Sequence, residues 1–234
     1  MIKEENMDLK NMFKGLKVLV LYLFMSVLSY ILLALFGINL DKLNIIIKQI
    51  YLILFESGII FIITLMYKEE FISNFKDFKK NWFTYLKKYT KCWIVALILM
   101  ILSTLVISIF TKTFESENQK IIIDQIHKMP LYTFIMIVIL SPIIEELVFR
   151  LSFKKIFPHT KFLFIFFSGL FFGFIHVIGN LENIINLLYI IPYSIPGFIF
   201  AYIYDKSNNI CIPISLHIIH NIFMMIIQII LIII

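Results

Sequence analysis

The chain has 234 residues, of which 61% are apolar and only 15% are charged, and its mean hydropathy is +0.95. This composition excludes an ordinary soluble domain and indicates a membrane protein. The net charge of +6 does not indicate nucleic-acid binding, because the lysines follow the distribution typical of the cytoplasmic side of a membrane protein.

Seven apolar stretches approach or exceed the roughly 20 residues that an α-helix needs to cross a bilayer core. Five carry no charge, the second contains Glu56, and the fourth is apolar until Glu145 and Glu146. In chain order they are residues 18–38, 49–67, 92–110, 131–149, 162–181, 183–204 and 207–234. The sequence therefore predicts an all-α fold, a polytopic transmembrane bundle of about seven helices. The first stretch is too long for a secretory signal, so we expect it to be retained.

The longest connection, residues 68–91, has aromatic residues at alternating steps of four and three, with lysines on the other face. This spacing predicts a cytoplasmic amphipathic helix over 70–90 in the headgroup region, in preference to a solvated linker. The positions are Phe71, Phe75, Phe78, Trp82, Tyr85 and Tyr89. We expect Trp82 and Trp93 to anchor interfaces.

The basic residues are unevenly divided between the two sides of the predicted membrane. If the N-terminus is cytoplasmic, 15 of the 21 fall on the cytoplasmic side and 5 on the outer side, with Arg150 set apart. We therefore predict a multi-pass cell-membrane protein with a cytoplasmic N-terminus and an external C-terminus. The polar connection 111–129 then lies on the outer surface. Cys92 and Cys211 do not indicate a disulfide.

The ionisable residues divide the chain into two parts of a single membrane domain. Residues 1–129 contain the first three spans and the amphipathic helix, and residues 130–234 contain the four remaining spans. Prolines predict irregular helices in the second part. Pro142 should free the carbonyl of Val138, and Pro192 and Pro196 should kink the sixth span.

The fourth span carries charges that are costly inside a membrane, about 2.5 to 3.5 kcal/mol each on insertion scales, and that are therefore functional candidates. Arg150 lies four residues beyond Glu146, which is the spacing of an ion pair. Glu145 lies about 100° from Glu146 around the helix and has no partner nearby in the sequence. Its carboxylate is therefore the candidate general base. The alternative is a static network in which both glutamates share Arg150.

The fifth span contains His176 on the same face as Phe172. It follows Gly169 and Gly173, a pair that allows another helix to approach closely. Counted from Lys161 at 1.5 Å per residue, His176 lies roughly 22 Å into the membrane, deeper than the other candidates.

The seventh span contains His217 and Asn221, four residues apart and therefore on one helical face. His220 is offset from His217 by three residues. Polar side chains on one face of an otherwise apolar helix should point into the bundle.

Together these segments resemble a known family. EELVFR (145–150), FGFIH (172–176) and HIIHN (217–221) look like the EExxxR, FxxxH and HxxxN motifs of the CAAX-protease and bacteriocin-processing (CPBP, or Abi) intramembrane proteases. The motifs occur in the family's order, and the resemblance covers about residues 130–225.

The resemblance implies an endopeptidase that hydrolyses peptide bonds in peptides or membrane-proximal protein segments. Glu145 would activate water with help from His176, and His217 and Asn221 would stabilise the oxyanion. Glu146, Arg150 and Phe172 would support the site. Bacterial members are linked to peptide maturation and bacteriocin self-immunity, and the Ile- and Lys-rich composition favours a bacterial origin.

The resemblance leaves the role of metal open. A zinc bound by Glu145, His176 and His217 with one open position is chemically reasonable. However, the chain contains no HExxH motif, and the family resemblance also permits a metal-free glutamate mechanism.

Two other function classes are possible. A catalytically silent scaffold that binds a sensor or partner protein would not need the complete motif set. A transporter could use buried Glu and His residues as a proton relay, but the sequence has no inverted repeat. Glu56 lies outside every motif and could line the cavity or be satisfied by a neighbouring helix.

Overall fold

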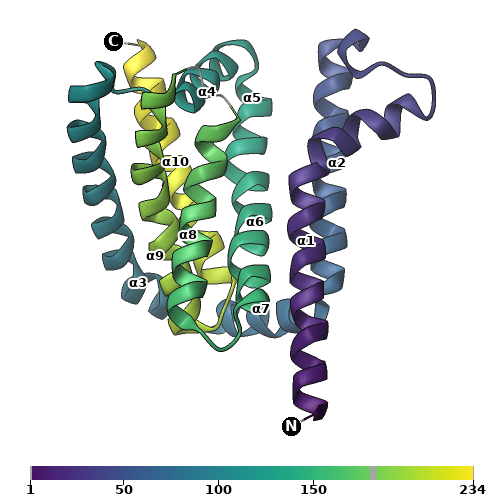
Figure 1. Ribbon diagram of the computed structural model, residues 1–234. Coiled ribbons are helices and arrows are strands. Elements are labelled where there is room, and N and C mark those ends of the chain that lie inside the picture. Colours follow the sequence, from purple (N-terminus) through teal and green to yellow (C-terminus); the bar gives the residue numbers. More distant parts are fainter. Residues whose placement is uncertain (1, 180–182, 234) are drawn as a thin grey trace.

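The computed structural model describes residues 2–179 and 183–233, and within these ranges the chain is helical without β-strands. In this part six helices are long and apolar enough to cross a membrane. They are α1 (Ile2–Ala34), α2 (Ile45–Met66), α3 (Lys68–Thr111), α8 (Lys161–Ile178), α9 (Ile190–Ser207, preceded by the 3₁₀ segment η4, Ile184–Tyr189) and α10 (Cys211–Ile233). The prediction of an all-α membrane bundle is confirmed. Figure 1 shows the two termini at opposite ends of the bundle.

The fourth predicted span is helical without interruption from 130 to 156, but its geometry alternates. Its segments are α5 (Pro130–Thr133), η2 (Phe134–Leu140), α6 (Ser141–Glu146), η3 (Leu147–Ser152) and α7 (Phe153–Ile156). Both η2 and η3 are π-helical. In a π turn the hydrogen bonds run from residue i+5 to residue i, and such turns are frequent at functional sites. This composite helix is the seventh membrane-length element of the described chain.

The amphipathic helix and the third span form one helix, α3, and not two separate elements as the sequence suggested. The stretch from 68 to 111 contains neither glycine nor proline, so nothing in it stops the helix. In Figure 1 its first half runs along the bottom of the bundle, and its second half rises on the side opposite α1 and α2. Phe71 and Phe78 pack against the core, whereas Phe75 and Trp82 remain exposed.

Hydrogen bonds attach the first half of α3 to the connection between α9 and α10. Asn209 Nδ2 donates to the carbonyl of Asn74 (2.9 Å) and to Asp77 Oδ2 (2.8 Å), and the N–H of Ile210 donates to Asn74 Oδ1 (2.6 Å). Hydrogen bonds from Tyr85 and Asn209 hold the pKa of Asp77 below its usual range. Their stabilising effect is therefore present at neutral pH and is lost as the pH falls through that lowered pKa.

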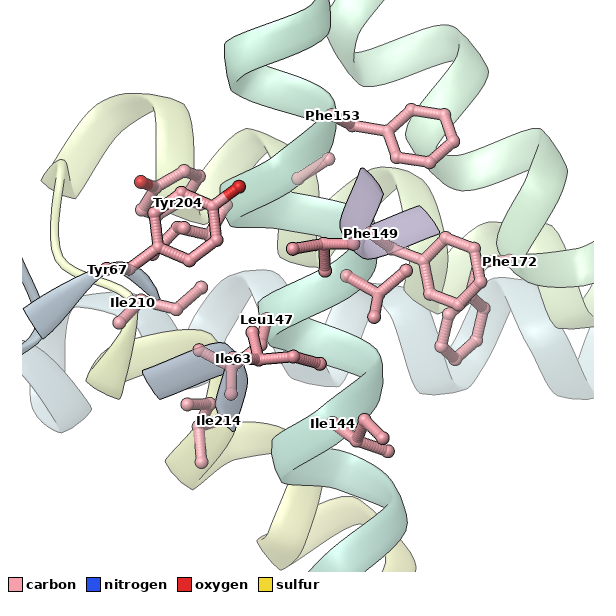
Figure 2. Packing of buried hydrophobic residues seen from close by; sticks show 14 of the residues in the cluster. Ile63, Tyr67, Ile144, Leu147, Phe149, Phe153, Phe172, Tyr204, Ile210 and Ile214 are labelled. Carbon is pink, nitrogen blue, oxygen red and sulfur yellow. The ribbon is translucent and has the colours of Figure 1, made fainter. Parts of the chain in front are cut away.

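The largest apolar cluster joins the end of α2, the α6–α7 segment, α8 and the start of α10 (Figure 2). At its centre the fully buried Phe149 ring meets Phe172 edge to face, with centroids 5.6 Å apart. Ile63 and Leu147 are also completely buried. Because lipid tails are as apolar as this cluster, close packing, and not exclusion from water, stabilises it.

Helices α8 and α9 approach closely where glycines face the neighbouring backbone. A Cβ atom on Gly173 would lie 2.7 Å from the carbonyl oxygen of Ile190, and one on Gly197 would lie 2.8 Å from that of Gly169. Backbone atoms cannot move aside as a flexible side chain can. The close helix approach expected from Gly169 and Gly173 is confirmed, and it places the end of α8 against α9.

The sixth span is less disturbed by proline than the sequence suggested. Pro192 lies in the first turn of α9, where a missing N–H leaves no intrahelical hydrogen bond unmade. Only Pro196 lies inside the helix, where it removes the bond to the carbonyl of residue 192. The predicted boundary between the fifth and sixth spans, at 181–183, lies mostly outside the described residues.

We expect Gly173→Ala to destabilise the bundle by about 1–3 kcal/mol, because the new methyl group overpacks the α8–α9 contact. Gly58→Ala is the matched control: no atom lies within 4 Å of the position of its Cβ, so the change should be neutral or slightly stabilising. Thermal unfolding in detergent measures both. Equal melting temperatures for the two variants would contradict the packing assigned to α8 and α9.

Candidate active site

A cavity of about 320 Å³ lies between α6, α8, α9, α10 and α4 (Glu117–Lys128). Glu145, His176, His217 and Asn221 all line it, together with Phe172. The structure thus brings the four predicted catalytic residues to one place, although they come from three separate helices. The sequence placed His176 deeper in the membrane than the other candidates because its depth was counted in residues from Lys161. That count assumed that all helices begin at the same depth.

Glu146 and Arg150 lie behind the cavity and are completely buried. Arg150 Nε lies 2.9 Å from Glu146 Oε2, and Arg150 Nη2 donates to Glu146 Oε1 at 3.1 Å. Arg150 Nη1 donates to Ser168 Oγ at 2.8 Å, and its guanidinium lies over the Phe172 ring, 5.0 Å from the centroid. The ion pair expected from the spacing is present, and it neutralises a carboxylate that could not otherwise be buried.

His217 lies between the two glutamates. Its Nδ1 is 3.0 Å from Glu146 Oε1, and its Nε2 is 3.7 Å from Glu145 Oε2. The ionised Glu146 can only accept a hydrogen bond, so His217 Nδ1 carries a proton. Its Nε2 therefore faces Glu145 as an acceptor when the ring is neutral, and as a donor only when the ring is an imidazolium.

His176 is oriented by its own helix. Its Nδ1 lies 2.7 Å from the carbonyl oxygen of Phe172, one turn earlier. A carbonyl cannot donate, so Nδ1 is protonated and Nε2 is the free acceptor of the neutral ring. In this form Nε2 can accept a hydrogen bond from a water molecule in the cavity.

Asn221 binds the carbonyl that Pro142 leaves without a partner. Its Nδ2 donates to the carbonyl oxygen of Ile137 at 2.8 Å. The sequence predicted that Val138 would be freed, but that prediction assumed α-helical geometry. In the π segment the N–H of Ser141 bonds to residue 136, so the missing N–H of Pro142 corresponds to residue 137. Asn221 thereby fastens α10 to the helix that carries the glutamates.

Helix α4 covers one end of the cavity, a role that the sequence did not reveal. The connection was expected to be a polar outer segment, but Ile121 and Ile122 line the cavity. Tyr193 links this cover to the site: its hydroxyl lies 2.7 Å from Ser116 Oγ, and its ring stacks on His176 with centroids 5.1 Å apart. The only sequence signal was a run of three isoleucines in a polar stretch.

The proposed zinc ligands do not fit a metal site in this arrangement. Across residues 2–179 and 183–233, no three His, Cys, Asp or Glu side chains are grouped so that they could hold an ion. Glu145 and His217 are close to each other, but His176 does not complete a set with them.

Glu56 does not belong to this site. It is buried on α2, is not among the residues that line the cavity, and has an Oε1 atom without a hydrogen-bond partner in the described chain. Cys92 and Cys211 are free thiols, and Cys211 is buried.

Comparison with known proteins matches the part of the chain that holds the motifs. Residues 127–223 match the family model described as type II CAAX prenyl endopeptidase Rce1-like. The "Putative membrane peptidase YdiL" of Bacillus subtilis (strain 168) is 34% identical over 116 residues, which is 49% of this chain and 44% of that protein. The chain thus matches less than half the length of this curated relative. No solved structure matches.

Proposed function

We propose that this chain is an intramembrane endopeptidase of the CAAX-protease and bacteriocin-processing family, which the Rce1-like match of residues 127–223 supports. Its substrates would be peptides or membrane-proximal protein segments, and its biological role bacterial peptide maturation or bacteriocin self-immunity. The observation that carries the proposal is the convergence of Glu145, His176, His217 and Asn221 on one cavity.

In the first step a water molecule in the cavity loses a proton to Glu145 while its other hydrogen is held by His176 Nε2. The water oxygen forms a bond to the peptide carbonyl carbon, and the carbonyl electron pair moves onto oxygen. Positioned proton transfer of this kind contributes about 10² to 10⁴ in rate. His217 Nε2 lies 3.7 Å from Glu145 Oε2, so its ring stands beside the carboxylate that takes the proton.

In the second step the tetrahedral intermediate collapses. The carbon–nitrogen bond breaks, and Glu145 returns its proton to the leaving amine. Before collapse the oxyanion needs hydrogen-bond donors, and loss of one such donor typically costs about 10² to 10³ in turnover. His217, as an imidazolium, and the second N–H of Asn221 are the donors offered by the motif residues.

The function is tested with purified protein in detergent and a panel of hydrophobic peptides, with and without a chelator. We expect cleavage that the chelator does not affect, since the described ligands do not group around an ion. Activity that is lost on chelation and restored by zinc would replace the glutamate mechanism by a metal mechanism. No cleavage of any peptide would favour the silent scaffold.

For the topology we propose a cytoplasmic N-terminus and an external C-terminus, which the lysine asymmetry favours. Alkaline phosphatase fused near Lys80, in the first half of α3, should be inactive, and the same enzyme fused after the final residue should be active. The reverse pattern would show that the protein has the opposite orientation in the membrane, with α4 and the covered end of the cavity on the cytoplasmic side.

A further inference from the structure

A third histidine lines the cavity and has a partner outside the motifs. His220 lies on α10 and faces the same cavity as His217, with ring centroids 6.4 Å apart. Trp93, on the second half of α3, donates its indole N–H to His220 Nδ1 at 3.3 Å. The two residues are 127 positions apart in the chain, so the contact depends on the fold.

The tryptophan determines which nitrogen of His220 carries hydrogen. An indole N–H can only donate, so His220 Nδ1 must be an unprotonated acceptor. The ring is then neutral, with its hydrogen on Nε2. In the described part of the chain the hydrogen bond from Trp93 is the only one that His220 makes, so its Nε2 hydrogen is available to a molecule in the cavity that it lines.

The other two histidines of the cavity carry hydrogen on the opposite ring nitrogen. His217 and His176 each carry hydrogen on Nδ1, because their partners are the Glu146 carboxylate and the Phe172 carbonyl. Their neutral rings present an acceptor to the cavity. Of the three histidines, only His220 presents a donor without gaining a charge. One of the two side-chain N–H groups of Asn221 donates to the carbonyl of Ile137 and is not available to the cavity.

From these contacts we infer that His220 is a catalytic residue of the proposed peptidase, whose Nε2–H binds the oxyanion of the tetrahedral intermediate, and that Trp93 is the positioning residue that fixes its tautomer. The inference rests on the proposed function. When water adds to the peptide carbonyl, the new oxyanion accepts the Nε2 hydrogen bond; when the carbon–nitrogen bond breaks, the carbonyl re-forms. His220 itself gains and loses no proton.

Three variants separate this role from a structural one. His220→Leu removes the donor and should lower kcat about 10² to 10³-fold with little change in KM. His220→Gln keeps an N–H donor, so its kcat should be at least about tenfold higher than that of His220→Leu. Trp93→Phe retains the aromatic contact with Phe223 but removes the indole N–H that fixes the tautomer of His220. It should lower kcat about tenfold. Trp82→Phe, on the exposed face of α3, is the matched control and should behave as wild type.

A measurement independent of activity is ¹⁵N NMR of histidine-labelled protein in detergent, with the His220 signals identified by their loss in His220→Leu. We expect hydrogen on Nε2 and none on Nδ1 in the wild type, and a mixture of tautomers in Trp93→Phe. Hydrogen on Nδ1 in the wild type would overturn the inference.

The kinetic outcomes distinguish the two proposals. If the wild type cleaves peptide in a Glu145-dependent way but His220→Leu turns over normally, His220 has no catalytic role and the peptidase proposal stands. If the wild type shows no such cleavage, the proposed function itself fails. If His220→Leu does not fold, a kcat of Trp93→Phe equal to that of Trp82→Phe overturns the inference.

Discussion

Glu145→Gln should reduce peptide cleavage to near background while the protein folds and binds substrate normally. The amide keeps the size and hydrogen-bonding capacity of the carboxylate but removes its basicity, and a positioned base is worth about 10² to 10⁴ in rate. Glu145 is the glutamate that faces the cavity, 3.7 Å from His217. The measurement is kcat per folded molecule, with binding measured separately.

The control for this variant is Glu56→Gln, which changes another buried intramembrane glutamate outside the cavity. It should keep cleavage within a few-fold of wild type. The double variant of Glu145→Gln and His176→Ala should be hardly worse than either single variant, because groups that act on one water are strongly non-additive. Substantial turnover by Glu145→Gln would show that Glu145 is not the base and would overturn the glutamate mechanism.

Arg150→Ala should lower the amount of folded protein far more than it changes the chemistry of the molecules that remain. It removes the buried partner of Glu146 and leaves that carboxylate uncompensated, which typically costs about 3–5 kcal/mol. It also leaves Ser168 Oγ without the guanidinium donor. Detergent-resistant expression, the melting temperature and activity per folded molecule measure the two effects separately.

Lys128→Ala is the matched control, since it removes another basic residue with an acidic partner four positions away. Lys128 and Asp124 lie 2.8 Å apart but are exposed on α4, so the loss should be within about 1 kcal/mol. Normal folding of Arg150→Ala with lost turnover would assign Arg150 to the chemistry of the site instead.

The sequence predicted the elements of this fold well because hydropathy and helical spacing are local properties. The apolar stretches, the aromatic face of the first half of α3 and the spacing of Glu146 and Arg150 can all be read within a few turns of helix. The glycines of α8 likewise indicated a close helix contact, which the α8–α9 packing confirms.

The parts that could not be predicted depend on helix register and on partners distant in the chain. The π turns before Pro142 moved the freed carbonyl from Val138 to Ile137, and no local pattern distinguishes the two. The contact between Trp93 and His220 crosses from α3 to α10. The sequence suggested that Trp93 anchors an interface, and only the fold reveals its contact with the cavity.

The tautomers of the histidines also required the structure. The spacing of the motifs places His176, His217 and His220 inside the bundle but does not say which ring nitrogen faces the cavity. A carbonyl, a carboxylate and an indole N–H, respectively, decide this. These partners separate the acceptors from the donor and thus assign distinct roles to three similar side chains.

The proposed mechanism requires that water in this cavity attacks the peptide bond without a covalent intermediate. A single-turnover reaction in H₂¹⁸O, stopped with acid and analysed by mass spectrometry of both peptide and protein, distinguishes this attack from attack by a protein nucleophile. We expect one ¹⁸O atom in the new carboxyl terminus of the product and no mass added to the protein at any time. A covalent peptide adduct on the protein, or the absence of ¹⁸O-labelled product, would contradict it.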